Sequence, residues 1–145
     1  MKDSLKVTGR LQIVVSDKDG NVKESRNIPN LVVGTGDNFI ASRMVGASAT
    51  VMSHMAVGTD STSASNSDTA LGTESARVAL TSSTASTNTV TYVATFPAGT
   101  GTAALVEAGL FNASSAGTML ARTTFSVINK GASDTLTVTW VITVG

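Results

Sequence analysis

Hydrophobic and polar residues alternate with a period of two along the first part of the chain. In residues 5–16 five apolar side chains share one side of an extended segment: Leu5, Val7, Leu11, Ile13 and Val15. Such alternation is typical of a strand with one buried face. Residues 22–27 follow the pair Asp19-Gly20. This predicts a β-hairpin, because glycine adopts a positive φ without steric cost.

Further strands are predicted at short, regular spacing, over residues 51–57, 77–81, 89–96, 105–111, 119–128 and 135–144. The last segment alternates most clearly: its inward residues are predicted to be Leu136, Val138, Trp140, Ile142 and Val144. Pro97 is expected to end the strand predicted at residues 89–96, since proline has no amide hydrogen to donate to a ladder. The Ser- and Thr-rich stretches 59–69 and 81–88 are predicted to be exposed loops.

Breaks in this pattern predict the remaining local structure. Asn27-Ile28-Pro29-Asn30 is expected to interrupt the second strand. Helical spacing of apolar residues predicts one short helix at 37–45, with Asp37 capping or charging its first turn. A helical turn capped by Asp68 is predicted at 68–71. The whole pattern predicts an all-β fold: a single domain, residues 1–145, forming an antiparallel, jelly-roll-like β-sandwich of about eight strands.

Composition narrows the classes of function. The 145 residues carry zero formal charge, and only 14% are charged, against about 25% in typical domains. There is no basic cluster of the kind that nucleic acid requires, and no apolar run approaching the length of a membrane span. With no cysteine, disulfides and thiolate metal sites are excluded. A neutral, Thr-rich surface repels its neighbours weakly, which favours a subunit of an assembly.

No catalytic, cofactor-binding or metal-binding residue is predicted. His54 is the only histidine and has no cysteine to join it, so a structural or interface role is expected. Serines lack the strand–turn–helix frame of a nucleophile elbow. Paired carboxylates for glycoside hydrolysis are not evident, since Asp60 and Asp68 fall in a polar loop while Glu74 and Glu107 are isolated. The chain is therefore expected not to be an enzyme.

Three short motifs are explained more simply by turns. Residues 17–21 resemble a calcium loop but lack its further acidic ligands and closing glutamate, so they are interpreted as the hairpin turn. Gly34 and Gly36 lack the βαβ setting of a phosphate loop and are interpreted as a strand-to-helix turn. Asn112-Ala113-Ser114 fits a glycosylation sequon, and a turn is the expected role.

Several segments carry a resemblance to a known class of proteins. They are Asn30-Leu31-Val32-Val33-Gly34, Phe39-Ile40-Ala41-Ser42-Arg43, Ser53-His54-Met55-Ala56-Val57-Gly58-Thr59, Asp68-Thr69-Ala70-Leu71 with Glu74 and Arg77, Thr91-Tyr92-Val93-Ala94-Thr95-Phe96, Glu107-Ala108-Gly109-Leu110-Phe111-Asn112, Gly117-Thr118-Met119-Leu120-Ala121-Arg122-Thr123 and the strand that contains Trp140. Together they cover most of the chain, and they resemble small structural proteins of tailed bacteriophages. Similar segments occur in head-decorating proteins and in tail-fibre-associated proteins.

This resemblance implies a non-enzymatic virion protein assembled in the host cytoplasm. Because the chain stops directly after its last strand, a capsid decoration (cement) protein is expected. Such a protein binds the major capsid protein on the outer capsid surface as a homo-oligomer, a dimer or trimer. Its partners would include neither nucleic acid nor membrane. The alternative is a tail, baseplate or tail-fibre adaptor component.

A second alternative is a module that binds carbohydrate or a host surface, which would require an exposed cluster of Tyr92, Phe96, Phe111 and Trp140. The charged N-terminal segment, residues 1–30, carries a separate hypothesis. The hypothesis is that this segment contacts capsid subunits or a neighbouring copy, partly by edge-strand pairing. An ordinary first hairpin with a solvated face explains its sequence equally well.

Overall fold

The structure is a computed structural model that describes residues 6–46 and 49–145. It contains one helix, α1 (Gly34–Arg43), and nine strands: β1 (Val7–Ser16), β2 (Val22–Val32), β3 (His54–Gly58), β4 (Glu74–Ala79), β5 (Ser82–Ser86), β6 (Thr89–Phe96), β7 (Ala103–Phe111), β8 (Met119–Lys130) and β9 (Thr135–Val144). All strand pairs are antiparallel. The predicted all-β class is confirmed, and the jelly-roll topology stays a prediction.

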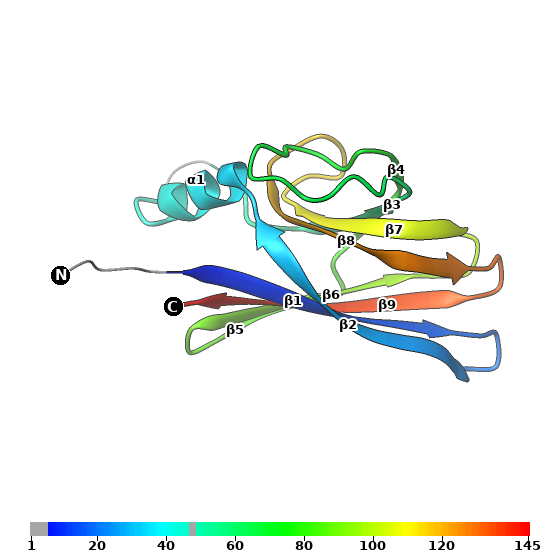
Figure 1. Cartoon of the computed structure of the whole chain (residues 1–145). Coiled ribbons are helices and arrows are strands. Elements are labelled where there is room, and N and C mark those ends of the chain that lie inside the picture. The colour runs from blue at the N-terminus through cyan, green and yellow to red at the C-terminus, as the bar shows by residue number, and fades with distance from the viewer. Residues whose placement is uncertain (1–5, 47–48) are drawn as a thin grey trace.

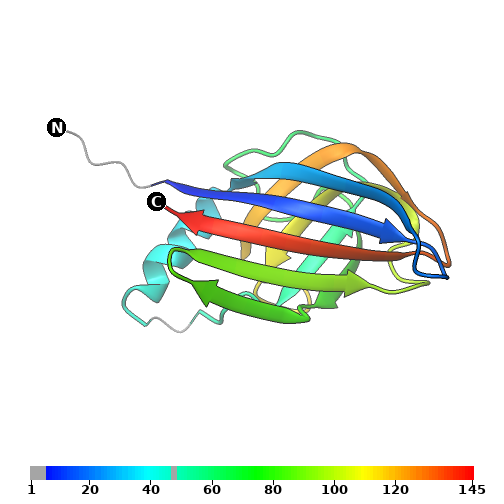
Figure 2. The same ribbon diagram turned by 90° about the horizontal axis from the view of Figure 1, so that it is seen from below.

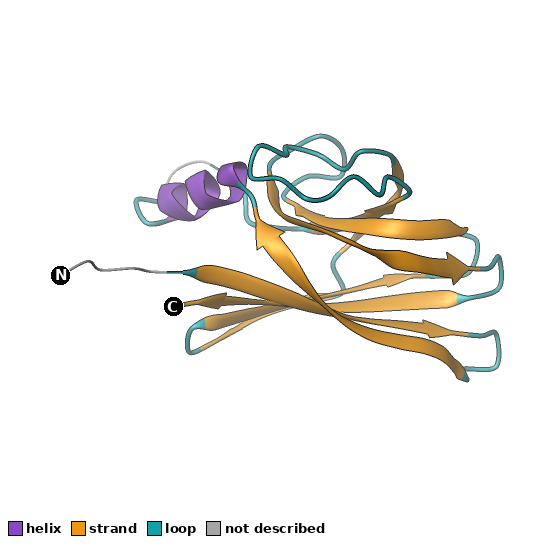
Figure 3. Ribbon diagram, viewed as in Figure 1, coloured by secondary structure: helices purple, strands orange, loops and turns teal. Residues whose placement is uncertain are grey.

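The strands form one sheet in the order β4-β3-β7-β8-β2-β1-β9-β6-β5. The sheet curls so that its two ends face each other (Figures 1 and 2). We call β4-β3-β7-β8 the covered half and β2-β1-β9-β6-β5 the open half. β2 joins them, because it pairs with β1 along most of its length and with β8 only at Leu31 and Val32. Figure 3 shows the long loops and the helix gathered beside the covered half.

The core lies between the two halves and is contributed by the inward sides that the alternation predicted. From the open half come Leu11, Ile13, Val15, Phe96, Leu136, Val138, Trp140 and Ile142, and from the covered half Met55, Leu105, Leu110 and Ile128. Val7 and Val144 are both partly buried, and Val7 packs against this core. Leu5 lies outside the described residues. The inward sides predicted for residues 7–16 and 135–142 are therefore confirmed.

The helix begins three residues earlier than predicted and ends at Arg43. Asp37 lies in its first turn as expected, but the N-cap is Val33, which makes no side-chain cap hydrogen bond. Contact with β8 explains the early start. A Cβ at Gly36 would lie 2.1 Å from the carbonyl oxygen of Leu120, so only glycine allows this approach. Met44, predicted as helical, lies exposed beyond the end of the helix.

The predicted interruption at Pro29 is wrong, because β2 continues through it to Val32. Proline is tolerated where the neighbouring side of a strand has no ladder. The pairing of β2 with β8 starts only at Leu31. The carbonyl oxygen of Pro29 instead accepts a hydrogen bond of 2.7 Å from the Thr123 hydroxyl.

Two Ser- and Thr-rich predictions also need correction. Residues 82–86 form strand β5 rather than a loop, because β6 supplies a complete antiparallel partner. No helical turn forms at 68–71, since the Asp68 carboxylate accepts hydrogen bonds from the Ser65 amide and from Arg122. The strands predicted at 51–57 and 77–81 are found as β3 and β4 with shifted ends.

Candidate functional site

A buried ion pair lies on the outer side of the covered half, away from the main core. Glu107 on β7 is 0% exposed and Arg122 on β8 is 2% exposed. The two strands are neighbours, and Arg122 is the register partner of Gly109, two residues beyond Glu107. Arg122 therefore reaches the carboxylate diagonally, and its Nε and Nη2 donate to Oε1 at 3.1 and 3.0 Å.

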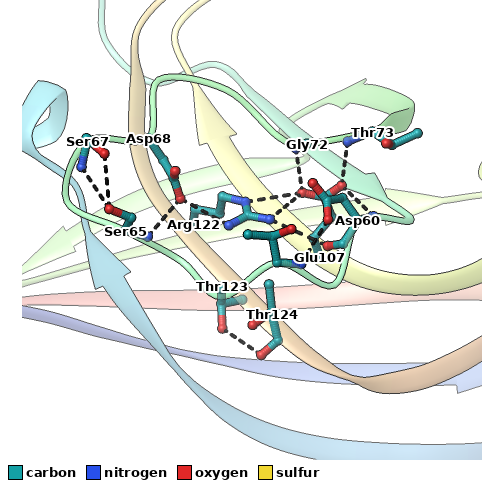
Figure 4. Close-up of polar contacts among 11 residues, drawn as sticks. Asp60, Ser65, Ser67, Asp68, Gly72, Thr73, Glu107, Arg122, Thr123 and Thr124 are labelled. Atoms are coloured by element: carbon teal, nitrogen blue, oxygen red, sulfur yellow. Dashed lines mark hydrogen bonds and ion pairs between the residues drawn. The ribbon is translucent and has the colours of Figure 1, made fainter.

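The carboxylate of Glu107 also holds the loop between β3 and β4 (Figure 4). Its Oε1 accepts a hydrogen bond from the Gly72 amide, and its Oε2 accepts hydrogen bonds from the amides of Asp60 and Thr73, each at 2.9 Å. Asp60 and Thr73 lie at opposite ends of this loop. One side chain thus closes residues 59–73 over the sheet.

Arg122 fixes the middle of the same loop. Its Nη1 donates to Asp68 Oδ2 at 3.0 Å, and that oxygen also accepts the Ser65 amide at 2.8 Å. From the sequence, Asp60 and Asp68 were expected in a polar loop and Glu107 as an isolated acidic residue, and the structure brings all three together around the Arg122 guanidinium. Glu107 within the apolar segment of β7 and Arg122 directly after Met119-Leu120-Ala121 of β8 were the signal from which this pairing could have been predicted.

Glycines let the loop approach the sheet closely. A Cβ at Gly58 would lie 2.2 Å from the carbonyl oxygen of Thr73 and 2.6 Å from Glu107 Oε2. Opposite Gly109, the side chain of Leu71 inserts into a small second core, which is formed by Val33, Ala56, Leu71, Phe111 and Met119. The outer side of the covered half is therefore itself an interior.

Arg77 holds a second loop over the same side. Its guanidinium carbon lies 3.8 Å from the centroid of the Phe111 ring, and its Nη1 donates to the carbonyls of Ala113 and Ala116, each at 2.9 Å. Asn112 closes this loop, because its Oδ1 accepts the Thr118 amide at 2.7 Å. The prediction that the Asn112 segment forms a turn is confirmed.

The remaining candidate residues have local structural contacts. His54 is half-buried, and its Nδ1 lies 2.8 Å from the Ser53 hydroxyl. Asp17 Oδ1 accepts the amides of Asp19 and Asn21, which confirms the hairpin-turn interpretation of residues 17–21. The Asn21 amide is the main cause that lowers the pKa of Asp17. Gly34 and Gly36 were interpreted as a turn before the helix, and they instead lie in the first turn of α1 itself.

Two further carboxylates have lowered pKa values. Asp60 Oδ1 accepts the Thr62 amide at 2.8 Å, and this hydrogen bond is the main cause that lowers its pKa, with the charge of Arg122 contributing less. Asp134 lies in the β8–β9 turn, where its hydrogen bond to Lys23 is the main cause that lowers its pKa. Nearby, burial lowers the pKa of Lys130, whose Nζ donates to the Pro97 carbonyl.

The outer side of the open half is built differently. Its outward positions follow from the strand register, and we call them the threonine face: Thr8, Arg10, Gln12, Val14 and Ser16 of β1, Thr135, Thr137, Thr139, Val141 and Thr143 of β9, Thr89, Thr91, Val93 and Thr95 of β6, and Ser82, Thr84 and Ser86 of β5. Arg10 is the one charged residue among these positions. Asn27 and Pro29 of β2 lie beside it, and a depression of about 190 Å³ opens between Arg10 and Thr139.

The exposed aromatic cluster that a carbohydrate-binding module would need is not formed. Phe96, Phe111 and Trp140 are each at most 1% exposed, and Tyr92 packs partly buried against the core. Trp140 Nε1 donates to Asn30 Oδ1 at 3.0 Å on the inward side of the sheet. These aromatic residues stabilise the fold.

Among the described residues, no group of three or more histidine or acidic side chains is placed to hold a metal ion. In the same residues no helix is both long enough and apolar enough to cross a bilayer. Comparison of the chain with protein-family models, with curated proteins and with solved structures gives no match.

Proposed function

We propose that this protein is a non-enzymatic structural subunit of a bacteriophage particle, a decoration protein that binds the outer surface of the capsid shell. The observation that carries the proposal is the threonine face, an extended sheet surface on which Arg10 is the only charged residue. The buried centres of protein interfaces are depleted in charged residues in the same way. The resemblance of the sequence to phage structural proteins supports the same conclusion.

The size of the threonine face suits one side of a specific interface. Strands lie about 4.8 Å apart and rise about 3.3 Å per residue, so the four strands of the threonine face together with the neighbouring β2 span roughly 600–800 Å². A standard interface buries about 800 Å² on each partner. Threonine hydroxyls can form hydrogen bonds across such a contact, while the methyl groups of Val14, Val93 and Val141 pack against the partner.

The position of the N-terminal segment changes one earlier hypothesis. β1 is an interior strand that pairs with β2 on one side and β9 on the other, so edge-strand pairing by residues 7–16 is wrong. β1 and β2 form an antiparallel hairpin, which is compatible with both hypotheses for this segment. The outward side chains of β1, including Thr8, Arg10 and Gln12, remain part of the proposed contact surface.

The first test is the copy number of the protein in purified virions, measured by quantitative mass spectrometry against the major capsid protein. A number comparable with that of the major capsid protein is expected for a decoration protein. A few copies per particle would contradict the proposal and would indicate a tail, baseplate or fibre-adaptor component.

A matched pair of variants then tests the surface. Thr139 lies near the middle of the threonine face, between Gln12 and Val93, so Thr139→Asp places a negative charge in the contact and should abolish binding to shells that lack the protein. Thr69→Asp places the same charge on the exposed loop of the covered half and should bind normally. Equal binding by both variants would overturn the assignment of this face.

A further inference from the structure

Strand β5 forms one edge of the sheet and lacks the protection that edges usually have. It pairs only with β6, and all five of its residues are exposed. Figure 2 shows it running along the free margin of the open half. An edge strand presents unpaired amide and carbonyl groups, and proteins normally protect it with charged residues, proline or a bulge.

The opposite edge, β4, has such protection. It carries Glu74 and Arg77, and its pairing with β3 is irregular next to Gly58. The sequence of β5 is Ser-Ser-Thr-Ala-Ser, with neither charge nor proline, and its pairing with β6 is regular. The absence of charge extends well beyond this strand, because no charged residue occurs in the sequence between Arg77 and Glu107.

We infer that β5 pairs antiparallel with β5 of a second copy of this chain, about a two-fold axis at Thr84. This register places Thr84 opposite Thr84 of the second copy, Ser82 opposite Ser86, and Ser83 opposite Ala85. Small side chains therefore meet small side chains, and threonine pairs across strands are favourable. Because isologous two-fold pairing brings identical surfaces together, an edge without charge suits this occupant better than a charged partner.

Pairing through β5 has a consequence for the larger surface. Ser82, Thr84 and Ser86 belong to the threonine face, so the two threonine faces would join side by side into one continuous sheet surface. A five-residue strand buries less area than a standard interface, so the dimer is expected to dissociate on dilution. The inference is independent of the proposed capsid function, since it concerns the free protein in solution.

Single-cysteine variants of the full chain test the register directly, because the protein has no cysteine of its own. Residues directly opposite in antiparallel strands have Cβ atoms about 4.5–5.5 Å apart, close to the distance that a disulfide requires. Thr84→Cys should form a disulfide-linked dimer under mild oxidation. Ser86→Cys is equally exposed on the same strand, but in this register it lies opposite Ser82 of the second copy, so the two introduced thiols do not face each other. It should cross-link at least about tenfold more slowly, since pairing raises the effective concentration only of thiols that face each other.

Sedimentation velocity over a series of concentrations tests the same contact without cross-linking. The wild-type protein should show a concentration-dependent dimer. Thr84→Lys should remove it, because two lysines would meet at the axis. Thr91→Lys adds the same charge to the neighbouring position on β6, one strand away from the edge, and should leave the dimer intact.

Three results would overturn the inference. They are a wild-type protein that stays monomeric at every concentration, equal cross-linking of Thr84→Cys and Ser86→Cys, and loss of the dimer in Thr91→Lys as well as in Thr84→Lys. The last result would place self-association on the threonine face. Equal capsid binding by Thr139→Asp and Thr69→Asp bears only on the proposed function, so the two proposals can fail separately.

Discussion

The outer side of the covered half and the outer side of the open half differ in what covers them and in their charge. Over the covered half, two loops lie on the strands and are held by Glu107, Arg122, Asp68 and Arg77, so that charged groups there act inside the protein. Over the open half, threonine, serine and valine occupy the outward positions of β1, β9, β6 and β5, and Arg10 is the only charged residue among these positions. The comparison teaches that charged side chains in this protein mainly hold its own loops, while the outward side of the open half is nearly neutral.

Connection length explains the difference. The loop between β3 and β4 spans residues 59–73, and the loop between β7 and β8 spans residues 112–118, so both have enough chain to fold back over the sheet. The open half is joined by short turns, such as residues 87–88 between β5 and β6. Tight turns cannot reach across a sheet face, so that face stays uncovered unless another molecule binds it.

The largest expected effect comes from removing the guanidinium of the covered half. Arg122→Ala leaves the buried carboxylate of Glu107 without its counter-charge, and breaking a buried ion pair in this way costs about 3–5 kcal/mol of the free energy of unfolding. Arg10→Ala, on the threonine face, should change it by no more than about 0.5 kcal/mol. Urea denaturation measures both values.

A double variant separates the effect of the unpaired buried charge from the effect of the lost hydrogen bonds to the loop. Replacing the pair by apolar residues of similar size, Glu107→Leu with Arg122→Met, removes the unpaired charge but also releases the amides of the loop. We expect only part of the stability to return, because the amides of Asp60, Gly72 and Thr73 lose their acceptor. Full recovery would mean that these three hydrogen bonds contribute little to folding.

A smaller loss is expected where the loop touches the sheet. Gly58→Ala brings a methyl group to 2.2 Å from the carbonyl oxygen of Thr73, so the loop must move outward. Overpacking of this kind typically costs about 1–3 kcal/mol. Ser82→Ala, on the exposed edge of the open half, serves as the control and should be nearly neutral. An equally small effect of both substitutions in thermal unfolding would show that the loop is not closely packed.

Acid should weaken the covered half through Asp60. Its pKa in the folded state is lowered from the ordinary value of 3.8, mainly by the Thr62 amide. The carboxylate therefore stabilises the fold above that value, and this contribution is lost as the pH falls through the lower folded pKa. Asp60→Asn should be less stable than the wild type at neutral pH, and the gap should narrow below pH 3.8. Urea midpoints measured across this range test it, and a constant gap would contradict the assignment.

The smallest effect on stability is expected on the threonine face itself. Thr139→Asp and Thr91→Lys should leave the free energy of unfolding within about 1 kcal/mol of the wild type, which is the span of strand propensities. Chemical denaturation provides the measurement. A much larger loss would show that these side chains support the fold, and the binding assays could then not be interpreted through the surface alone.

Several features of the fold could be predicted because their causes are local. Strands β6 and β9 begin and end where the alternation and Pro97 place them, and the inward sides of β1 and β9 are the predicted ones. Asp17 and Gly20 form the first hairpin turn, where Gly20 has a φ of +84°. The helix was predicted in the right place but with the wrong ends, because its first turn depends on contact with Leu120 of a distant strand.

The sequence by itself determined the antiparallel all-β class, most strand positions and the inward residues of β1 and β9, since period-two burial and turn chemistry act within a few residues. Only the tertiary structure decided that residues 82–86 become an edge strand, that β2 passes through Pro29, and that Glu107 meets Arg122. Each of these depends on which strands become neighbours and in what register. The same long-range pairing decides which side of the sheet the loops cover and leaves the threonine face open.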